Sequence, residues 1–213
     1  MRYRSALLLV TFFGSALSQQ PFDGALTIAL ASDYKVPSDV SQAMQKEVES
    51  LLAPAGVQVS WHDADSNTPG VYERLASIRL RGKCVLGAPF PATMRLIKTD
   101  VDALGQTQVV DGMVLPIADV LCDSVRRLID REIRSSPAAE RDELLGRALG
   151  RVMAHELYHV LLRTRDHGHN GLARPAQSSV ELLAARNPFA EQDERKVSVS
   201  ASVPTGGFAE SDR

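Results

Sequence analysis

Residues 138–163 read AAERDELLGRALGRVMAHELYHVLLR, and this stretch decides the fold. It is rich in Ala, Leu, Glu and Arg and contains no proline, which favours one long helix. Ser136 and Pro137 stand directly before it and supply an N-cap and a first-turn proline. Apolar residues recur on one face of this helix, at Leu145, Ala148 and Val152. Because residues three and four apart share a face, the same face continues onto His155 and His159.

Two histidines and a glutamate in this helix form an H-E-x-x-H motif, His155-Glu156-Leu157-Tyr158-His159. Imidazoles one turn apart can both reach one zinc ion at about 2.0–2.1 Å. Zinc lowers the pKa of a water molecule from about 15.7 towards about 7, so Glu156 can take its proton and later deliver it to the leaving amine. The motif therefore predicts peptide-bond hydrolysis. An ordinary buried histidine pair is less favoured, because unpaired imidazoles are costly to bury.

A catalytic zinc site needs a third protein ligand and an open position. The loop after the helix carries His167 beside Gly168, and a glycine permits the turn that would bring this histidine back to the metal. We therefore expect His167 to be the third ligand. Three other side chains that follow the helix remain alternatives, namely His169, Asp166 and Glu181.

Upstream of this helix, short apolar runs alternate with turn residues. The run 25–30 predicts a buried strand, and residues 37–52 predict an amphipathic helix that ends at Pro54. Residues 57–61 and 75–81 alternate apolar with polar, as half-buried strands do. The chain therefore opens with strand, helix, strand and strand, and further strand material follows over 108–121.

The two ends of the chain differ from its middle. Residues 1–18 begin with a basic lead, continue as the apolar run 6–13 and end in small residues, which is typical of a secretory signal peptide. The apolar run is well short of the ~20 residues that span a membrane, so we expect an exported chain without a membrane span. Residues 19–190 are expected to form one zinc metallopeptidase-like domain, and the polar tail 191–213 is expected to be disordered.

Export also decides how the cysteines are interpreted. Cys84 and Cys122 are the two cysteines of the chain, and an oxidising compartment lets such a pair form a stable disulfide. Neither has a nearby Cys or His partner of the C-x-x-C kind, so metal binding is the least favoured alternative. We expect one disulfide between them.

The net charge of the chain argues against two classes of partner, nucleic acids and acidic membrane surfaces. Its formal net charge is −2 and its basic residues are scattered, so it lacks the basic patch of a nucleic-acid or polybasic membrane binder. A peptide or protein substrate is the partner that the motif predicts. The sequence does not indicate an oligomeric state.

The block HELYHVLLRTRDHGHNGL, residues 155–172, resembles the active-site region of the metzincin clan of zinc peptidases, particularly its small matrixin-like and archaemetzincin-like exported forms. The resemblance implies an α/β fold, in which one domain has a twisted, mostly parallel sheet packed on the active-site helix and a C-terminal part made mostly of loop. It also implies that His155, Glu156 and His159 are first ligand, general base and second ligand. The order of elements matches from about Ala25 to Glu181.

The chain departs from the clan at two places. The longer pattern H-E-x-x-H-x-x-G-x-x-H requires Gly and His where this chain has Leu162 and Arg165. A longer connection after the helix would account for this and would move the third ligand to His167. The methionine turn of the clan also lacks its methionine, because the best-placed segment, 171–174, carries Ala173 instead.

Two other functions stay open. A gluzincin-like zinc peptidase would take Glu181, from a following helix, as its third ligand. A non-catalytic exported binding module would use zinc only to cross-link the helix and the loop, with all four coordination positions of the zinc occupied by protein ligands. A glutamate beside the first histidine is superfluous in such a closed site, which favours the enzyme.

Overall fold

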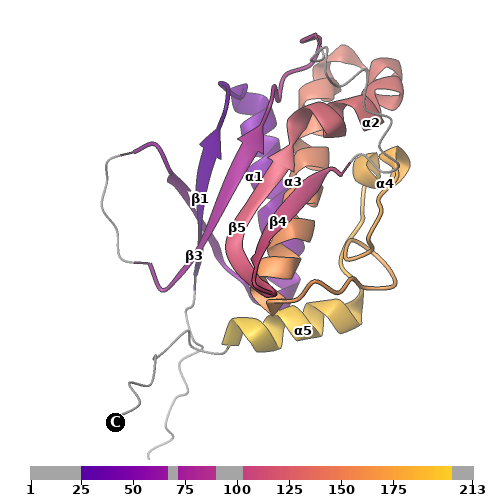
Figure 1. The fold of residues 1–213 in the computed structure, drawn as a ribbon. Helices are drawn as coiled ribbons and strands as arrows, with labels where there is room; N and C mark the ends of the chain where they lie inside the picture. The colour runs from indigo at the N-terminus through magenta and orange to yellow at the C-terminus, as the bar shows by residue number, and fades with distance from the viewer. Residues whose placement is uncertain (1–24, 67–71, 90–102, 203–213) are drawn as a thin grey trace, which may run out of the picture.

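The computed structural model describes residues 25–66, 72–89 and 103–202 (Figure 1). The predicted signal peptide, residues 1–18, lies outside the described residues. So do residues 203–213, which belong to the tail that the sequence predicts to be disordered.

Five strands form one sheet in the order β2-β1-β3-β5-β4. Their bounds are β1 Leu26–Ser32, β2 Val59–Asp63, β3 Arg74–Arg81, β4 Gly105–Val110 and β5 Met113–Leu121. The pairs β1/β2, β1/β3 and β3/β5 are parallel, whereas β4 runs antiparallel to β5. The sheet is therefore mostly parallel, as expected, and β4 is one of its edge strands.

The helices are α1 Ser38–Leu52, α2 Cys122–Ser135, α3 Arg141–Leu162, α4 Ser179–Leu183 and α5 Glu191–Ser202. Helices α1 and α3 lie on the same face of the sheet, and α5 lies near the C-terminal end of α3 (Figure 1). Within the described ranges, no helix is both long enough and apolar enough to cross a membrane. The mixed α/β architecture confirms the fold class that the sequence predicts.

The spacing of apolar residues decides which side of each element is buried. On helix α1, the buried residues are the ones that recur at helical spacing, Val40, Met44, Val48, Leu51 and Leu52. On strand β3, alternate residues are fully buried, namely Ala76, Ile78 and Leu80. These residues share one hydrophobic core with helix α3, and the same core reaches Val197 in helix α5.

The long helix predicted over 138–163 is α3, and it begins slightly later than expected. Residues Ala138–Glu140 form a 3-10 turn, and the α-helix starts at Arg141. Arg163 ends the helix in the left-handed conformation, with φ 50°. The chain thus turns away from the helix axis one helical turn after the second histidine of the motif.

Residues 191–202 form helix α5, so the prediction of a disordered tail is wrong for this stretch. The helix buries Asp193 and Val197, which are four residues apart on its inner face. A row of apolar residues at helical spacing is the signal that reveals a packed helix in a sequence. Here a buried carboxylate, Asp193, interrupts that row, so the signal is absent from residues 191–202.

Helix α3 approaches helix α1 closely at Gly146. A Cβ atom on this residue would lie 2.5 Å from the carbonyl oxygen of Val40 and 2.6 Å from the Cβ of Ala43. We expect Gly146→Ala to lower the free energy of unfolding by roughly 1–3 kcal/mol, because overpacking outweighs the better helix propensity of alanine. Urea unfolding measures this change. Glu143→Ala, at an exposed position of the same helix, should stay within about 0.5 kcal/mol. An unchanged midpoint for Gly146→Ala would contradict the close approach.

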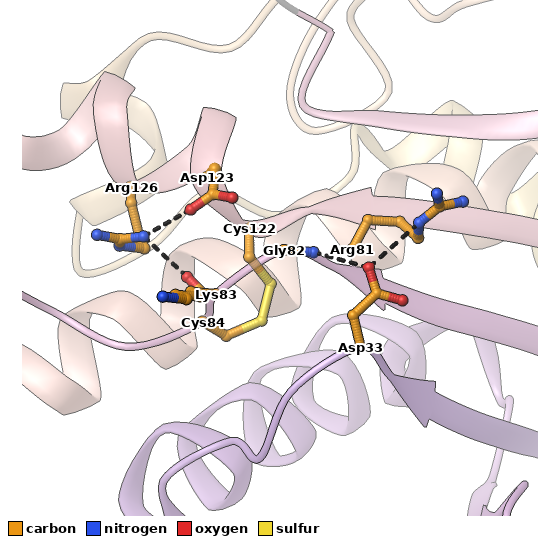
Figure 2. The surroundings of a disulfide bond; sticks show 8 residues. All are labelled: Asp33, Arg81, Gly82, Lys83, Cys84, Cys122, Asp123 and Arg126. Carbon is orange, nitrogen blue, oxygen red and sulfur yellow. Dashed lines mark hydrogen bonds and ion pairs between the residues drawn. A yellow bond between two sulfur atoms is a disulfide. The ribbon is translucent and has the colours of Figure 1, made fainter. Parts of the chain in front are cut away.

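Cys84 and Cys122 form the disulfide that the sequence predicts, with their Cα atoms 5.0 Å apart. The bond joins the segment after β3 to the first residue of α2. Figure 2 shows the side chain of Arg126 next to it, where one guanidinium nitrogen donates to the carboxylate of Asp123 at 2.6 Å and to the carbonyl of Lys83 at 3.0 Å. The start of α2 is thus attached to the segment after β3 by the disulfide and by the hydrogen bond from Arg126 to Lys83, and the ion pair with Asp123 holds the Arg126 side chain within α2 itself.

Removing this disulfide is expected to cost stability without changing the fold. The two cysteines are 38 residues apart, so the bond restricts the unfolded chain considerably. Replacing both by serine should lower the free energy of unfolding by roughly 2–4 kcal/mol. Urea unfolding of the double variant, compared with the unmodified protein with and without reductant, measures the loss. Equal midpoints in all three samples would show that the bond contributes no stability.

Candidate metal centre

Helix α3 and the loop after it together hold the imidazoles of His155 and His159 in place. The Nδ1 atom of His155 donates to the carbonyl of Leu172 at 2.8 Å, and the Nδ1 atom of His159 donates to the carbonyl of Thr164 at 2.9 Å. Both carbonyls belong to the loop that begins where Arg163 ends the helix. Each ring is therefore oriented by a backbone group that lies outside the helix.

The same loop brings His167 to the two helix histidines. One ring nitrogen from each of the three residues can be chosen so that all lie within 4.8 Å of one another. The ring centroid of His167 is 4.7 Å from that of His159 and 5.3 Å from that of His155. Two of the three come from consecutive helical turns, and the third comes from the loop five residues beyond the end of the helix.

The alternative third ligands are not part of this group. His169 and Asp166 are exposed residues of the same loop and do not join the three histidines. The carboxylate of Glu181 accepts from the backbone N and the hydroxyl of Ser178, at 2.8 and 2.7 Å, as the capping box of helix α4. It also pairs with Arg174 at 2.6 Å. Glu181 thus has a structural role at α4, away from the histidines.

The three histidines fit a zinc ion chemically. Because each Nδ1 of the helix pair donates its proton to a carbonyl, the neutral imidazoles present bare Nε2 lone pairs to each other at 3.2 Å. Two such acceptors repel each other unless a cation lies between them. Nitrogens bound at about 2.0–2.1 Å to a tetrahedral zinc lie roughly 3.3 Å apart. His155, His159 and His167 are therefore the described residues that could hold the metal.

The surroundings keep the two helix histidines, His155 and His159, neutral. Burial lowers the pKa of His155 from its ordinary value of 6.5 to about 4; the hydrogen bond to Leu172 opposes this, and repulsion from His159 and His167 adds to it. Burial likewise lowers the pKa of His159. Neutral imidazole is the form that binds metal, so both residues are ready to act as ligands at neutral pH.

Glu156 lies beside the first histidine and is only 5% exposed. Its Oε2 accepts a hydrogen bond of 2.7 Å from the hydroxyl of Thr107, on strand β4. Burial raises the pKa of Glu156 from its ordinary value of 4.5 to about 7, and the contact with Thr107 partly opposes the rise. A carboxyl group with a pKa near neutrality can both take and return a proton, as a general base requires.

In the metal-free protein, Glu156 should make stability fall as the pH rises. Below pH 4.5 the group is protonated in both folded and unfolded chains, and above about 7 it is ionised in both, so the folded state then holds a buried charge. A rise from 4.5 to about 7 corresponds to roughly 3 kcal/mol of free energy of unfolding lost across that window. The side chain of Glu156→Gln does not titrate. Between pH 4.5 and about 7, the free energy of unfolding of this variant should therefore rise by about that amount relative to that of the unmodified protein.

Urea unfolding of both proteins in chelator, at about pH 5 and about pH 8, measures this difference. Both carry the same histidines, so the difference isolates Glu156. A constant difference between the two proteins across the range would contradict the raised pKa.

A cleft of about 900 Å³ is lined by these groups, a volume within the usual range of ligand sites. One wall is strand β4, which contributes Gly105, Thr107 and Val109. The loop after α3 also lines the cleft, with Thr164 and His167 among others, and helix α2 contributes Ser124 and Leu128. The three histidines and Glu156 all line this cleft, so the candidate metal centre is open to a substrate.

The structure adds Thr107 to the residues that the sequence singles out. It lies 49 residues before Glu156, on an edge strand, and a lone threonine in a polar strand carries no signal of a site. The segment 171–174, the best-placed one for the methionine turn of the clan, contacts His155. It does so through the carbonyl of Leu172, a backbone group that any residue could supply.

Comparison with known proteins adds a relation of fold. No protein-family model matches the chain, and no curated protein sequence matches it. Among solved structures, the chain is similar to the crystal structure of archaemetzincin from Methanopyrus kandleri, with a TM-score of 0.51 and 15% sequence identity. The similarity covers 84% of this chain and 97% of that one. The chain therefore shares the mixed α/β fold of archaemetzincin, as the resemblance of its active-site block implies.

Proposed function

We propose that this protein is an exported zinc-dependent peptidase, with zinc held by His155, His159 and His167. One observation carries the proposal: ring nitrogens of three histidines lie within 4.8 Å of one another in the lining of an open cleft, next to a buried glutamate. A structural zinc site has all four positions closed by protein ligands. Here the described residues offer three candidate ligands next to an open cleft, which supports a catalytic site.

Each side chain has a role in the proposed reaction. Zinc bound by the histidines would supply a Lewis acid that makes water acidic enough to react near neutral pH. Glu156 takes a proton from the attacking water and later delivers it to the leaving amine. Thr107 holds the carboxylate of Glu156 in one orientation through its 2.7 Å hydrogen bond. The carbonyls of Leu172 and Thr164 fix the tautomers of the two helix histidines.

A peptide substrate fits the shape of the cleft. Strand β4 forms one wall and lies at the edge of the sheet, so its outer backbone groups can pair with an extended chain. Alternate residues of β4, Gly105, Thr107 and Val109, line the cleft. An extended peptide bound along β4 would run past Glu156. This geometry supports cleavage within a peptide chain, and hence an endopeptidase.

The proposal is tested by metal analysis together with peptide digestion. Purified protein reconstituted with zinc should hold one zinc ion per chain by elemental analysis. A library of unstructured peptides, analysed by mass spectrometry, should be cleaved by the zinc-loaded protein, should not be cleaved after chelation, and should be cleaved again when zinc is restored. Bound zinc without cleavage would favour the non-catalytic binding module, and absence of bound zinc would contradict the central claim.

Export is part of the proposal and has two supports. Residues 1–18 have the composition of a signal peptide, and the disulfide between Cys84 and Cys122 is typical of an oxidising compartment. N-terminal sequencing of the protein recovered outside the cytoplasm of expressing cells should give a start near residue 19. Recovery of the full-length chain in the cytoplasm, with both cysteines reduced, would contradict export.

A further inference from the structure

Asp193, outside the candidate metal centre, is a fully buried acidic residue with one carboxylate oxygen that lacks a hydrogen-bond partner. It lies in the first turn of helix α5 and is 0% exposed. Among the described residues, its Oδ2 is the one buried side-chain nitrogen or oxygen that has no hydrogen-bond partner. Burying a carboxylate oxygen without a partner costs stability, and an apolar residue of similar size would avoid that cost. The position therefore calls for a role other than stability.

The other oxygen of Asp193 ties helix α5 to helix α3. The hydroxyl of Tyr158 donates to Oδ1 at 3.3 Å, and the ammonium of Lys196 donates to the same atom at 2.9 Å. Tyr158 directly precedes the metal-ligand candidate His159 and packs against it, with ring centroids 5.6 Å apart. One side of Asp193 is thus in contact with the helical turn that carries His159.

The unpartnered oxygen of Asp193 faces the loop that carries His167. A Cβ atom on Gly168, the next residue, would lie 2.4 Å from this oxygen and 2.8 Å from the Cβ of Ala173. The backbone of Gly168 therefore lies almost in contact with the carboxylate, and no larger residue fits. The loop is closed on itself here, because the N–H of Gly168 donates to the carbonyl of Ala173 at 2.8 Å.

This loop closure links the surroundings of two ligand candidates. Gly168 follows His167, and Leu172, which precedes Ala173, supplies the carbonyl that orients His155. Asp193 lies against the closed loop at Gly168, which follows His167, and accepts a hydrogen bond from Tyr158, which precedes His159. A single buried side chain of α5 thus contacts the chain neighbours of two ligand candidates, and the loop closure at Gly168 connects it to the segment that orients the third, His155.

We propose that Asp193 is a positioning residue, which holds the loop of His167 against helix α3 and so completes the three-histidine site. The proposal rests on the metal site of the proposed function. It differs from a purely stabilising role in what it predicts. A stabilising residue affects the free energy of unfolding, whereas a positioning residue changes the geometry of the metal in the folded protein.

Cobalt-substituted protein tests this difference, because the visible absorption of Co²⁺ reports the number and geometry of its ligands. The variants are Asp193→Ala, Gly168→Ala and His167→Ala, and the matched control is Glu191→Ala, an exposed acidic residue of the same helical turn. Gly168→Ala acts on the same contact from the loop side and removes nothing from the core. Zinc affinity is measured in parallel by competition with a chromogenic chelator, and circular dichroism verifies folding.

We expect Asp193→Ala and Gly168→Ala to bind zinc roughly 10- to 100-fold more weakly, as is typical when a support of a metal ligand is removed. Their cobalt spectra should move towards that of His167→Ala, whereas Glu191→Ala should keep the spectrum and affinity of the unmodified protein. Unchanged spectra and affinities in folded Asp193→Ala and Gly168→Ala would overturn the proposal, even if both variants were less stable. Should Asp193→Ala fail to fold, Gly168→Ala decides alone.

The outcomes also separate this proposal from the proposed function. If the unmodified protein binds Co²⁺ and Zn²⁺ but cleaves no peptide, the peptidase function fails while the positioning role is still decided by the spectra. If the unmodified protein binds neither metal, both proposals fail together.

Discussion

Glu156→Gln is expected to reduce the rate of peptide hydrolysis by about 10²- to 10⁴-fold while leaving zinc bound. Glutamine has the shape of glutamate and can still accept the hydrogen bond from Thr107, so the site should keep its geometry. It cannot take a proton from the attacking water, which removes the proposed general base. The measurement is kcat/KM on a peptide identified in the library digestion, together with zinc content.

Glu181→Gln is the matched control for this change. It is chemically identical and lies in the capping box of helix α4, outside the histidine group. Its kcat/KM should stay close to that of the unmodified protein. Full activity in Glu156→Gln would refute the role of general base, and loss of zinc in the same variant would show that Glu156 helps to bind the metal instead.

His167→Ala is expected to weaken zinc binding by more than about 100-fold, since even the loss of an outer hydrogen-bond partner of a ligand costs roughly 10- to 100-fold. Two ligands on one helix remain, and they do not close a zinc site. Zinc also stabilises the folded state in proportion to the logarithm of its affinity, so the rise in melting temperature on adding zinc should largely disappear. Elemental analysis after dialysis and thermal unfolding with and without zinc measure both effects.

His169→Ala provides the control, because His169 is an exposed histidine of the same loop and lies outside the group. It should keep both the zinc and the thermal shift. Glu181→Ala should also keep the zinc, since its carboxylate caps helix α4. Loss of zinc with either control, and retention with His167→Ala, would show that the third ligand has been assigned to the wrong residue.

Elements with a strong apolar period were predictable from the sequence. Helix α1 buries the five residues that its spacing indicates, and strand β3 buries alternate residues. Helix α2 was not predicted, although Val125, Ile129 and Ile133 recur every four residues and are all buried. The strongly charged residues between them conceal this stripe. A helix with one narrow apolar face therefore carries only a weak signal in its sequence.

Helix α5 could not be predicted by the same reasoning. Its inner face carries Asp193 where an apolar residue would be expected, and that carboxylate is buried because the loop of Gly168 and the ring of Tyr158 cover it. Neither partner is close in sequence. Burial of a charged residue is a property of the assembled fold, and a local pattern does not contain it.

The sequence by itself determined the part of the site that lies within one helix. Residues four apart in a helix share a face, so the motif alone places His155 and His159 together with Glu156 beside them. The tertiary structure decided everything that joins distant segments. The approach of His167, and not of its neighbours, to the two helix histidines depends on how the loop folds back after Arg163, and the contact of Thr107 with Glu156 depends on the packing of β4 against α3. Short-range geometry follows from the covalent chain, whereas these contacts follow from a core that forms only when the whole domain has folded.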